Sequence, residues 1–301
     1  MSHIDSAHRA QSIQNKEEVD IIYHYCSLET FLNIIKYSSL WLTDILKSND
    51  GKELSWIKEK INKNIELELT NLGNEALEAW KTFIDYKKFG NCSGTFYTAC
   101  FSECPDSLSQ WRGYAQDGEG LAIGFSKSPL NSLNNQPPFP YPLFIFDRVI
   151  YDEKSQNAFV KSIVRETMNK IGYKGIGHIA IEFNFESNFR YIFYKNPSFS
   201  EEKEWRLTMN STVNREPMLQ TNLSFSENNY IVSNGKLVSY VALDFSRIKH
   251  SFVKEVWIGP KSKVSQQDII NLLSRFNYYN KCDGYSFDES VRIRHSVSSY
   301  R

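Results

Sequence analysis

Apolar and aromatic residues fall into short runs along this chain, and polar turns separate the runs. The segment 20–25 has β-strand character, and Ser27 can cap a helix over 28–37, where apolar side chains recur at helical spacing. Further strands are expected over 40–43, 95–102, 121–125, 143–151, 203–209, 237–243, 255–258 and 291–295.

Three more helices are predicted from their capping residues. The first follows Ser107, the second runs from Asp152 to a stop at Gly172, and the third follows Ser265. The segment 178–194 remains ambiguous, because it begins with an alternating pattern but its length favours a helix.

The order of these elements lacks a regular strand–helix–strand alternation. This favours an α+β fold with a mainly antiparallel central sheet flanked by helices. Residues 1–18 are polar and are expected to form a flexible arm, and 19–301 a single α+β domain. A helical insertion is expected at about 50–90, where Asp50 and Glu53 resemble an acidic capping box and the high charge density predicts solvent exposure.

Composition narrows the class of protein. Lysine plus arginine and aspartate plus glutamate number 35 each, so the formal net charge is zero and no polyanionic partner is indicated beyond a local basic patch. No run approaches the roughly 20 apolar residues that span a bilayer, and the N-terminus lacks an apolar signal-peptide core. The five cysteines, an odd number, suit free thiols in a reducing compartment. We therefore expect a cytoplasmic protein with no membrane partner.

The segment from Glu202 to Arg206 is the most informative for chemistry. If the chain is extended here, Glu202, Glu204 and Arg206 share one face of a strand. With two adjacent carboxylates beside a guanidinium, one carboxylate can act as a base and the other can stabilise positive charge. Repulsion raises the pKa of one carboxylate, while the arginine keeps the other ionised. The alternative is an exposed ladder of charges on a solvated strand, and the sequence alone favours that alternative.

Two other segments carry candidate binding residues. His24 lies in an apolar, aromatic strand, where one ring nitrogen can meet a ligand hydroxyl while the other bonds to the backbone; a half-buried structural histidine is the alternative. Ser102 ends a strand and can hydrogen-bond a sugar or orient a glutamate. Tyr114 lies off the apolar face formed by Leu108 and Trp111, and can stack on a planar heterocycle.

No metal site is predicted. Cys92, Cys100 and Cys104 lack the Cys-x-x-Cys pair of a zinc site, and Cys26 has no sign of an acidic thiol. The segment 259–263, Gly-Pro-Lys-Ser-Lys, lacks the spacing of a phosphate-binding loop and is explained by a turn before a helix cap.

Four motifs resemble a widespread bacterial family that is catalogued as a domain of unknown function, over about residues 20–260. They are Tyr23-His-Tyr-x-Ser27, Asn49-Asp50-x-x-Glu53, Cys100-Phe-Ser-Glu with Trp111-x-x-Tyr-Ala and Gly-Phe125, and Glu202-x-Glu-x-Arg206.

The order of these motifs is also similar to that of the ADP-ribosyltransferase superfamily, whose members carry a first-strand His or Arg, a central strand ending in Ser or Tyr, and a late Glu-x-Glu. The resemblance implies an ADP-ribosyltransferase-like fold with NAD as substrate. A compact Ser-Thr-Ser motif is absent, and Cys100-Phe-Ser stands in its place.

Carried over by position, the resemblance assigns each candidate a role. His24 contacts a ribose hydroxyl, Ser102 supports the catalytic glutamate, and Tyr114 stacks on nicotinamide. Glu204 holds the 2′-hydroxyl of the nicotinamide ribose, and Glu202 takes the acceptor's proton. Tyr23 and Arg206 are further candidates for NAD binding.

Three hypotheses follow. The leading one is an NAD-dependent ADP-ribosyltransferase that acts on a protein or nucleic-acid acceptor, in a toxin or phage-defence setting. The alternative is a non-catalytic module that binds a nucleotide or a protein. A third is a metal-dependent nuclease that uses Asp50, Glu53 and Glu202, although capping accounts for Asp50 and Glu53.

Overall fold

A computed structural model describes most of the chain. It covers residues 20–47, 51–72, 95–135, 143–171, 191–211, 222–233, 235–279 and 291–300, with 74, 78 and 81. The expected N-terminal arm, Asp50 and most of the ambiguous segment 178–194 lie outside these residues.

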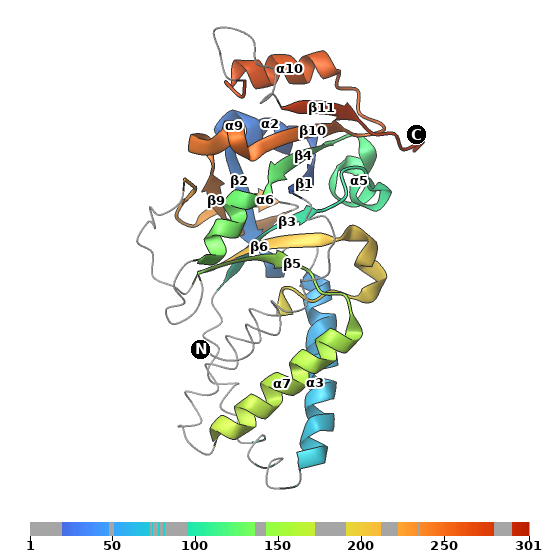
Figure 1. Cartoon of the computed structure of the whole chain (residues 1–301), viewed down its shortest axis with the longest axis vertical. Coiled ribbons are helices and arrows are strands. Elements are labelled where there is room, and N and C mark those ends of the chain that lie inside the picture. The colour runs from blue at the N-terminus through green and yellow to red at the C-terminus, as the bar shows by residue number, and fades with distance from the viewer. Residues whose placement is uncertain are drawn as a thin grey trace.

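One mixed sheet of eleven strands forms the body of the described chain (Figure 1). The strands are β1 (Ile21–Cys26), β2 (Ser39–Asp44), β3 (Phe96–Ser102), β4 (Leu121–Ser126), β5 (Phe144–Arg148), β6 (Glu204–Asn210), β7 (Ser224–Phe225), β8 (Asn229–Ser233), β9 (Lys236–Asp244), β10 (Val253–Ile258) and β11 (Arg292–His295). Their main order is β11-β10-β4-β1-β3-β2-β9-β7, with β6 and β5 beyond β3 and β8 on β9. Only the pairing of β10 with β11 is parallel, so the expected α+β fold with a mainly antiparallel sheet is confirmed.

Helices and short 3₁₀ turns connect the strands. They are α2 (Leu28–Tyr37), α3 (Gly51–Leu72), α5 (Leu108–Tyr114), α6 (Lys127–Asn131), α7 (Glu153–Ile171), α9 (Lys249–Phe252) and α10 (Gln266–Arg275), with η1 (Ile45–Lys47), η2 (Gln116–Gly118), η3 (Ser132–Asn135), η4 (Pro197–Glu202) and η5 (Ser246–Ile248). The pattern of apolar residues did not predict β7 and β8, because β7 is only two residues long and β8 exposes Tyr230 and Val232 at the rim of the sheet.

Three of the predicted helices begin with a capping hydrogen bond, whereas Ser107, which precedes α5, makes no side-chain capping hydrogen bond. The Ser27 side chain accepts a hydrogen bond from the Thr30 amide at the start of α2, and Ser265 and Asp268 form a capping box on α10. The Asp152 carboxylate likewise accepts a hydrogen bond from the Ser155 amide at the start of α7. These side chains satisfy amide groups that the first helical turn leaves without a partner.

Strand β1 is covered on both faces. Ile22 and Cys26 belong to the main buried cluster, which includes residues of α2 and α10. Tyr23 and Tyr25 point the other way and pack with Trp111 of α5. Two hydrogen bonds of the Tyr25 hydroxyl position α5. The hydroxyl donates to the Cys104 carbonyl (2.7 Å) and accepts from the Ser107 amide (3.0 Å).

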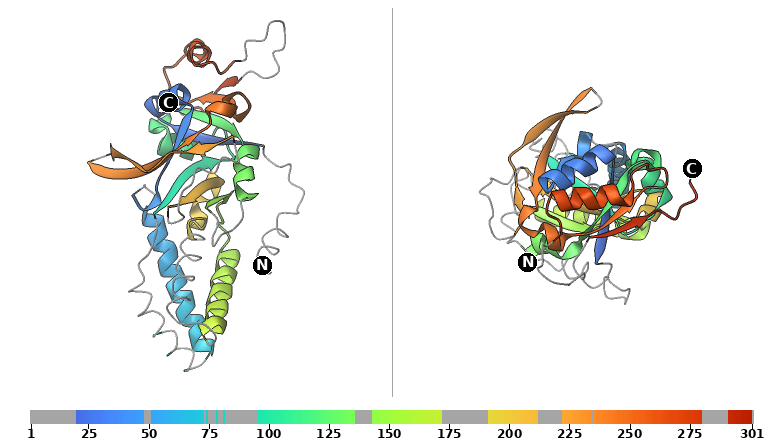
Figure 2. Two further views of the ribbon diagram at one scale, coloured as in Figure 1. Left: turned by 90° about the vertical axis from the view of Figure 1, so that its left-hand side faces the viewer. Right: turned by 90° about the horizontal axis from the view of Figure 1, so that it is seen from above.

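Helices α3 and α7 project together from the sheet (Figures 1 and 2). Buried Glu68 of α3 meets Lys161 and Arg165 of α7, at 3.3 and 3.5 Å. The expected insertion at about 50–90 therefore begins with one long helix, and its partner in the described chain comes from a distant segment. The rest of the insertion lies largely outside the described residues.

The sheet opens between β1 and β3, and this opening positions the candidate site. These strands pair at Tyr23 and Ser102 alone, whereas β3 pairs with β6 at seven positions on its other edge. Beyond this single pair, the Cys100 carbonyl is hydrogen-bonded to Nδ1 of the His24 ring (2.9 Å) and not to a backbone amide of β1. No helix of the described chain is long and apolar enough to cross a membrane.

Candidate functional site

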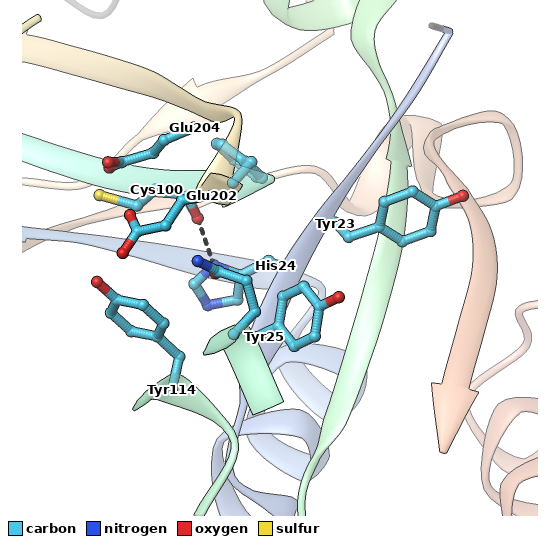
Figure 3. A pocket seen from close by; sticks show the side chains of 9 residues that line it. Tyr23, His24, Tyr25, Cys100, Tyr114, Glu202 and Glu204 are labelled. Atoms are coloured by element: carbon cyan, nitrogen blue, oxygen red, sulfur yellow. Dashed lines mark hydrogen bonds between the residues drawn. The ribbon is translucent and has the colours of Figure 1, made fainter. Parts of the chain in front are cut away.

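A pocket lies where β1 and β3 diverge (Figure 3). Its empty volume, open mouth included, is about 340 Å³, and it is lined by Tyr23, His24, Tyr25, Cys100, Phe101, Gln110, Tyr114, Glu202 and Glu204. Side chains from four separate parts of the chain therefore meet in one place. His24 and Glu204, 180 positions apart in the sequence, share this pocket.

The carboxylate segment is not an exposed ladder of charges, so the alternative that the sequence alone favours is wrong. Glu202, Glu204 and Arg206 are only 7%, 5% and 1% exposed. The segment is also not extended from Glu202. Lys203 adopts the left-handed conformation (φ 43°) and ends η4, so β6 begins at Glu204. Because of this turn, the two carboxylates reach the same pocket from different elements.

Two buried cations neutralise the carboxylate pair. Arg206 holds Glu204 with two hydrogen bonds, from Nε at 2.6 Å and from Nη2 at 3.0 Å, and it also donates to the Ile192 carbonyl. Lys195, which is fully buried, donates from Nζ to Glu202 at 2.5 Å and to Glu204 at 3.2 Å. The four side chains therefore form a closed cluster in which two negative and two positive charges balance.

Sequence reasoning missed Lys195. A signal was available, because this single lysine ends the apolar, aromatic run 191–194 immediately before Asn196 and Pro197. A lysine in such a run is buried only if it is paired, and the carboxylates of Glu202 and Glu204 follow it by only seven and nine positions.

Glu204 is held in its ionised form. Burial alone would raise its pKa, but the charges of Arg206 and Lys195, with hydrogen bonds from Arg206 and the Cys100 thiol, outweigh burial and lower the pKa below its ordinary value. This carboxylate is therefore a fixed negative charge in the wall of the pocket.

His24 is neutral for the opposite reason. Burial is the largest influence and lowers its pKa, although the hydrogen bond to Cys100 acts in the other direction. Because a carbonyl oxygen can only accept, Nδ1 must carry the proton, and Nε2 is left as an acceptor in the neutral ring. No partner for Nε2 occurs among the described residues.

Two of the predicted binding residues, Ser102 and Arg206, do not line the pocket, and a third, Tyr23, lines it with its hydroxyl engaged elsewhere. The Ser102 hydroxyl donates to the backbone carbonyl of Glu202 at 2.6 Å and touches neither carboxylate group. The hydroxyl of Tyr23 donates to Glu255 at 3.0 Å and points away from the other labelled side chains (Figure 3). Arg206 lies behind Glu204 and does not line the pocket. Ser102 and Arg206 therefore fix the two glutamates in place.

Tyr114 lies at the mouth of the pocket, 38% exposed, and Figure 3 places its ring on the side of Glu202. Gln110 precedes it by one helical turn on α5, so both side chains project from the same face of that helix. The sequence analysis assigned no role to Gln110, which is nevertheless buried in the pocket wall.

In the part of the chain that the structure describes, no three His, Cys, Asp or Glu side chains are grouped so as to hold a metal ion. The nuclease hypothesis needs Asp50 and the Glu53 side chain, and these lie outside the described atoms.

One family model matches the chain. It is described as a protein of unknown function (DUF2971), and the match spans residues 110–207, which hold Gln110, Tyr114, Lys195, both glutamates and Arg206. No curated protein and no solved structure matches the chain significantly. The expected resemblance to a family of unknown function is confirmed over residues 110–207, which match the model of that family.

Proposed function

We propose that the protein is an NAD-dependent ADP-ribosyltransferase-like enzyme, which cleaves the nicotinamide glycosidic bond and transfers ADP-ribose to a protein or nucleic-acid acceptor. One observation carries the proposal: a buried, charge-balanced Glu202–Glu204 pair shares a pocket with neutral His24 and the ring of Tyr114.

The chemistry fits a fixed carboxylate. Cleavage of the bond between C1′ of the ribose and the pyridinium nitrogen sends the electron pair to that nitrogen and leaves positive charge on C1′ and the ring oxygen. A negative group already in place stabilises this charge as it develops. Glu204 serves here, since its pKa lies below the ordinary value, and one of its oxygens takes the ribose 2′-hydroxyl.

The second carboxylate completes the transfer. The acceptor's nucleophilic atom forms the new bond to C1′, and its proton passes to Glu202 as general base. His24 Nε2 accepts a hydrogen bond from a ribose hydroxyl, and the ring of Tyr114 stacks on the nicotinamide.

A specific observation supports a second function, a non-catalytic module that binds a nucleotide or a protein. Both carboxylates already have buried cations as partners, and Arg206 occupies both oxygens of Glu204. Such saturation also suits glutamates that only maintain the shape of a binding site.

The test is nicotinamide release from NAD by the purified protein, with and without cell extract as a source of acceptor. Glu204→Gln should reduce release by on the order of a hundred-fold or more. Glu103→Gln is the matched control, because Glu103 lies outside the pocket and bonds Trp205 Nε1 at 2.9 Å.

Thermal unfolding of each variant separates loss of chemistry from loss of fold. Release by wild type and Glu103→Gln but not by folded Glu204→Gln supports the transferase. A thermal shift with NAD but no release in any preparation supports the binding module, and full activity of Glu204→Gln refutes the assigned mechanism.

A further inference from the structure

Gln110 is a buried polar side chain without a protein partner. It is 7% exposed and lines the pocket, and no hydrogen bond of its amide occurs within the described chain. Its amide atoms face the open pocket and are not among the fully buried atoms without a partner, so water can bond them in the free protein and a ligand can displace that water. Polar groups of this kind in a native protein call for an explanation, and a ligand or ordered water is the usual one.

The position of Gln110 is fixed by its neighbours. Next to it, Trp111 is fully buried, packs edge-on against Tyr25 at 4.7 Å and donates from Nε1 to Asp106 at 2.6 Å. These contacts anchor α5 against β1, so the amide of Gln110 faces the pocket from a rigid element. Such rigidity suits recognition of a specific group rather than a solvated surface role.

The amide sets strict requirements on its partner. It offers a carbonyl acceptor and an NH₂ donor side by side, so a group that satisfies both must present an adjacent donor and acceptor in one plane. The nearby ring of Tyr114 favours a planar, aromatic carrier for that group. A primary carboxamide on an aromatic ring meets both conditions.

We propose that Gln110 recognises the carboxamide of nicotinamide and is a specificity-determining residue of this pocket. This inference rests on the proposed function for the identity of the ligand. The Gln110 NH₂ donates to the carboxamide oxygen and the Gln110 oxygen accepts from the carboxamide NH₂, so two direct hydrogen bonds to the ligand replace bonds to water. Adenine also presents a paired donor and acceptor to glutamine, so binding of the adenine half here is an outcome that the test must separate.

The experiment compares NAD with 3-acetylpyridine adenine dinucleotide, an analogue of the same net charge in which a methyl group replaces the carboxamide NH₂. Dissociation constants are measured by calorimetry for wild type, Gln110→Leu and the control Ser109→Ala. Ser109 is the preceding residue on α5, does not line the pocket and bonds Ser107. Each protein's affinity ratio for the two dinucleotides is then compared, so effects common to both ligands cancel.

Wild type and Ser109→Ala should prefer NAD by about ten-fold, and Gln110→Leu should bind both dinucleotides equally. The variant should remain folded, since an apolar group replaces an unpaired amide. If wild type and Gln110→Leu show the same affinity ratio, the inference is overturned. Binding of adenine in the pocket would give this result. In that case nicotinamide release still decides the proposed function. Failure of wild type to bind NAD overturns both.

Discussion

Lys195→Met is the most demanding test of the carboxylate cluster. The substitution keeps most of the side-chain length but removes the buried ammonium group that contacts both Glu202 and Glu204, at 2.5 and 3.2 Å. Arg206 then faces two carboxylates alone. The charge of the four-residue cluster changes from zero to minus one in a site where Lys195 is 0% exposed.

The magnitude follows from burial. Removing one partner of a buried ion pair costs about 3–5 kcal/mol, because the remaining charge is left uncompensated away from water. The free energy of unfolding of a native protein is typically about 5–15 kcal/mol, so the loss is a large fraction of the total. With an m value of about 2–3 kcal/mol/M, the urea midpoint should fall by about 1–2 M.

Urea unfolding at pH 7 measures the effect, and two comparisons isolate its cause. Adding Glu202→Gln to Lys195→Met returns the cluster to zero charge and should recover much of the loss. Lys261→Met removes an equally short ion pair, 2.5 Å from Asp117, but that pair is exposed, so the midpoint should hardly change.

The pH dependence provides a further check. The deficit of Lys195→Met should narrow as the pH falls towards 5, because protonation of one carboxylate restores the charge balance. The reasoning is refuted if Lys195→Met shifts the midpoint no more than Lys261→Met, or if the double variant is no more stable than Lys195→Met alone.

Two other predictions concern the protonation of His24 and the packing around Gly120. Burial lowers the pKa of His24 below 6.5, so the unfolded chain binds a proton that the folded chain refuses, and stability falls as the pH drops below 6.5. His24→Asn should therefore lose less stability than wild type between pH 7 and 5 in urea titrations, and parallel curves would contradict this. Gly120→Ala should lower the free energy of unfolding by about 1–3 kcal/mol or more, because its Cβ would lie 2.2 Å from the Cys26 carbonyl oxygen. Gly113→Ala in α5, with no atom within 4 Å of its Cβ, should instead be neutral or stabilising, and equal effects of the two changes would refute the packing argument.

The local structure of this protein was largely predictable from its sequence. Ser27 and Ser265 are followed by apolar residues at helical spacing, and both cap helices as expected. Strands such as β3 and β9 were recognised because their apolar residues are consecutive or alternate, which only a covered sheet explains. Helix capping and the spacing of apolar residues depend on positions within one or two turns, so both can be predicted from a single sequence.

The candidate site was only partly predictable. The sequence indicated His24, Tyr114, Glu202 and Glu204 by residue type, and all four line one pocket. It could not give the left-handed turn at Lys203, a conformation that the Cβ of lysine disfavours and that the surrounding contacts impose. The sequence also suggested an exposed charged strand. A row of charged residues has the same sequence pattern whether water or buried cations stabilise the charges.

Only the tertiary structure decided which distant residues meet. Gln110 carries no local signal that distinguishes it from a surface residue, and the apolar run before Lys195 indicates burial but not its partners; yet Lys195 is fully buried between two carboxylates and Gln110 lies in the pocket wall. The opening between β1 and β3 depends on the pairing of strands more than seventy positions apart. Sequence patterns report the periodicity of burial along the chain, whereas charge compensation and pocket formation depend on contacts across it, and those contacts are set by the packing of the whole sheet.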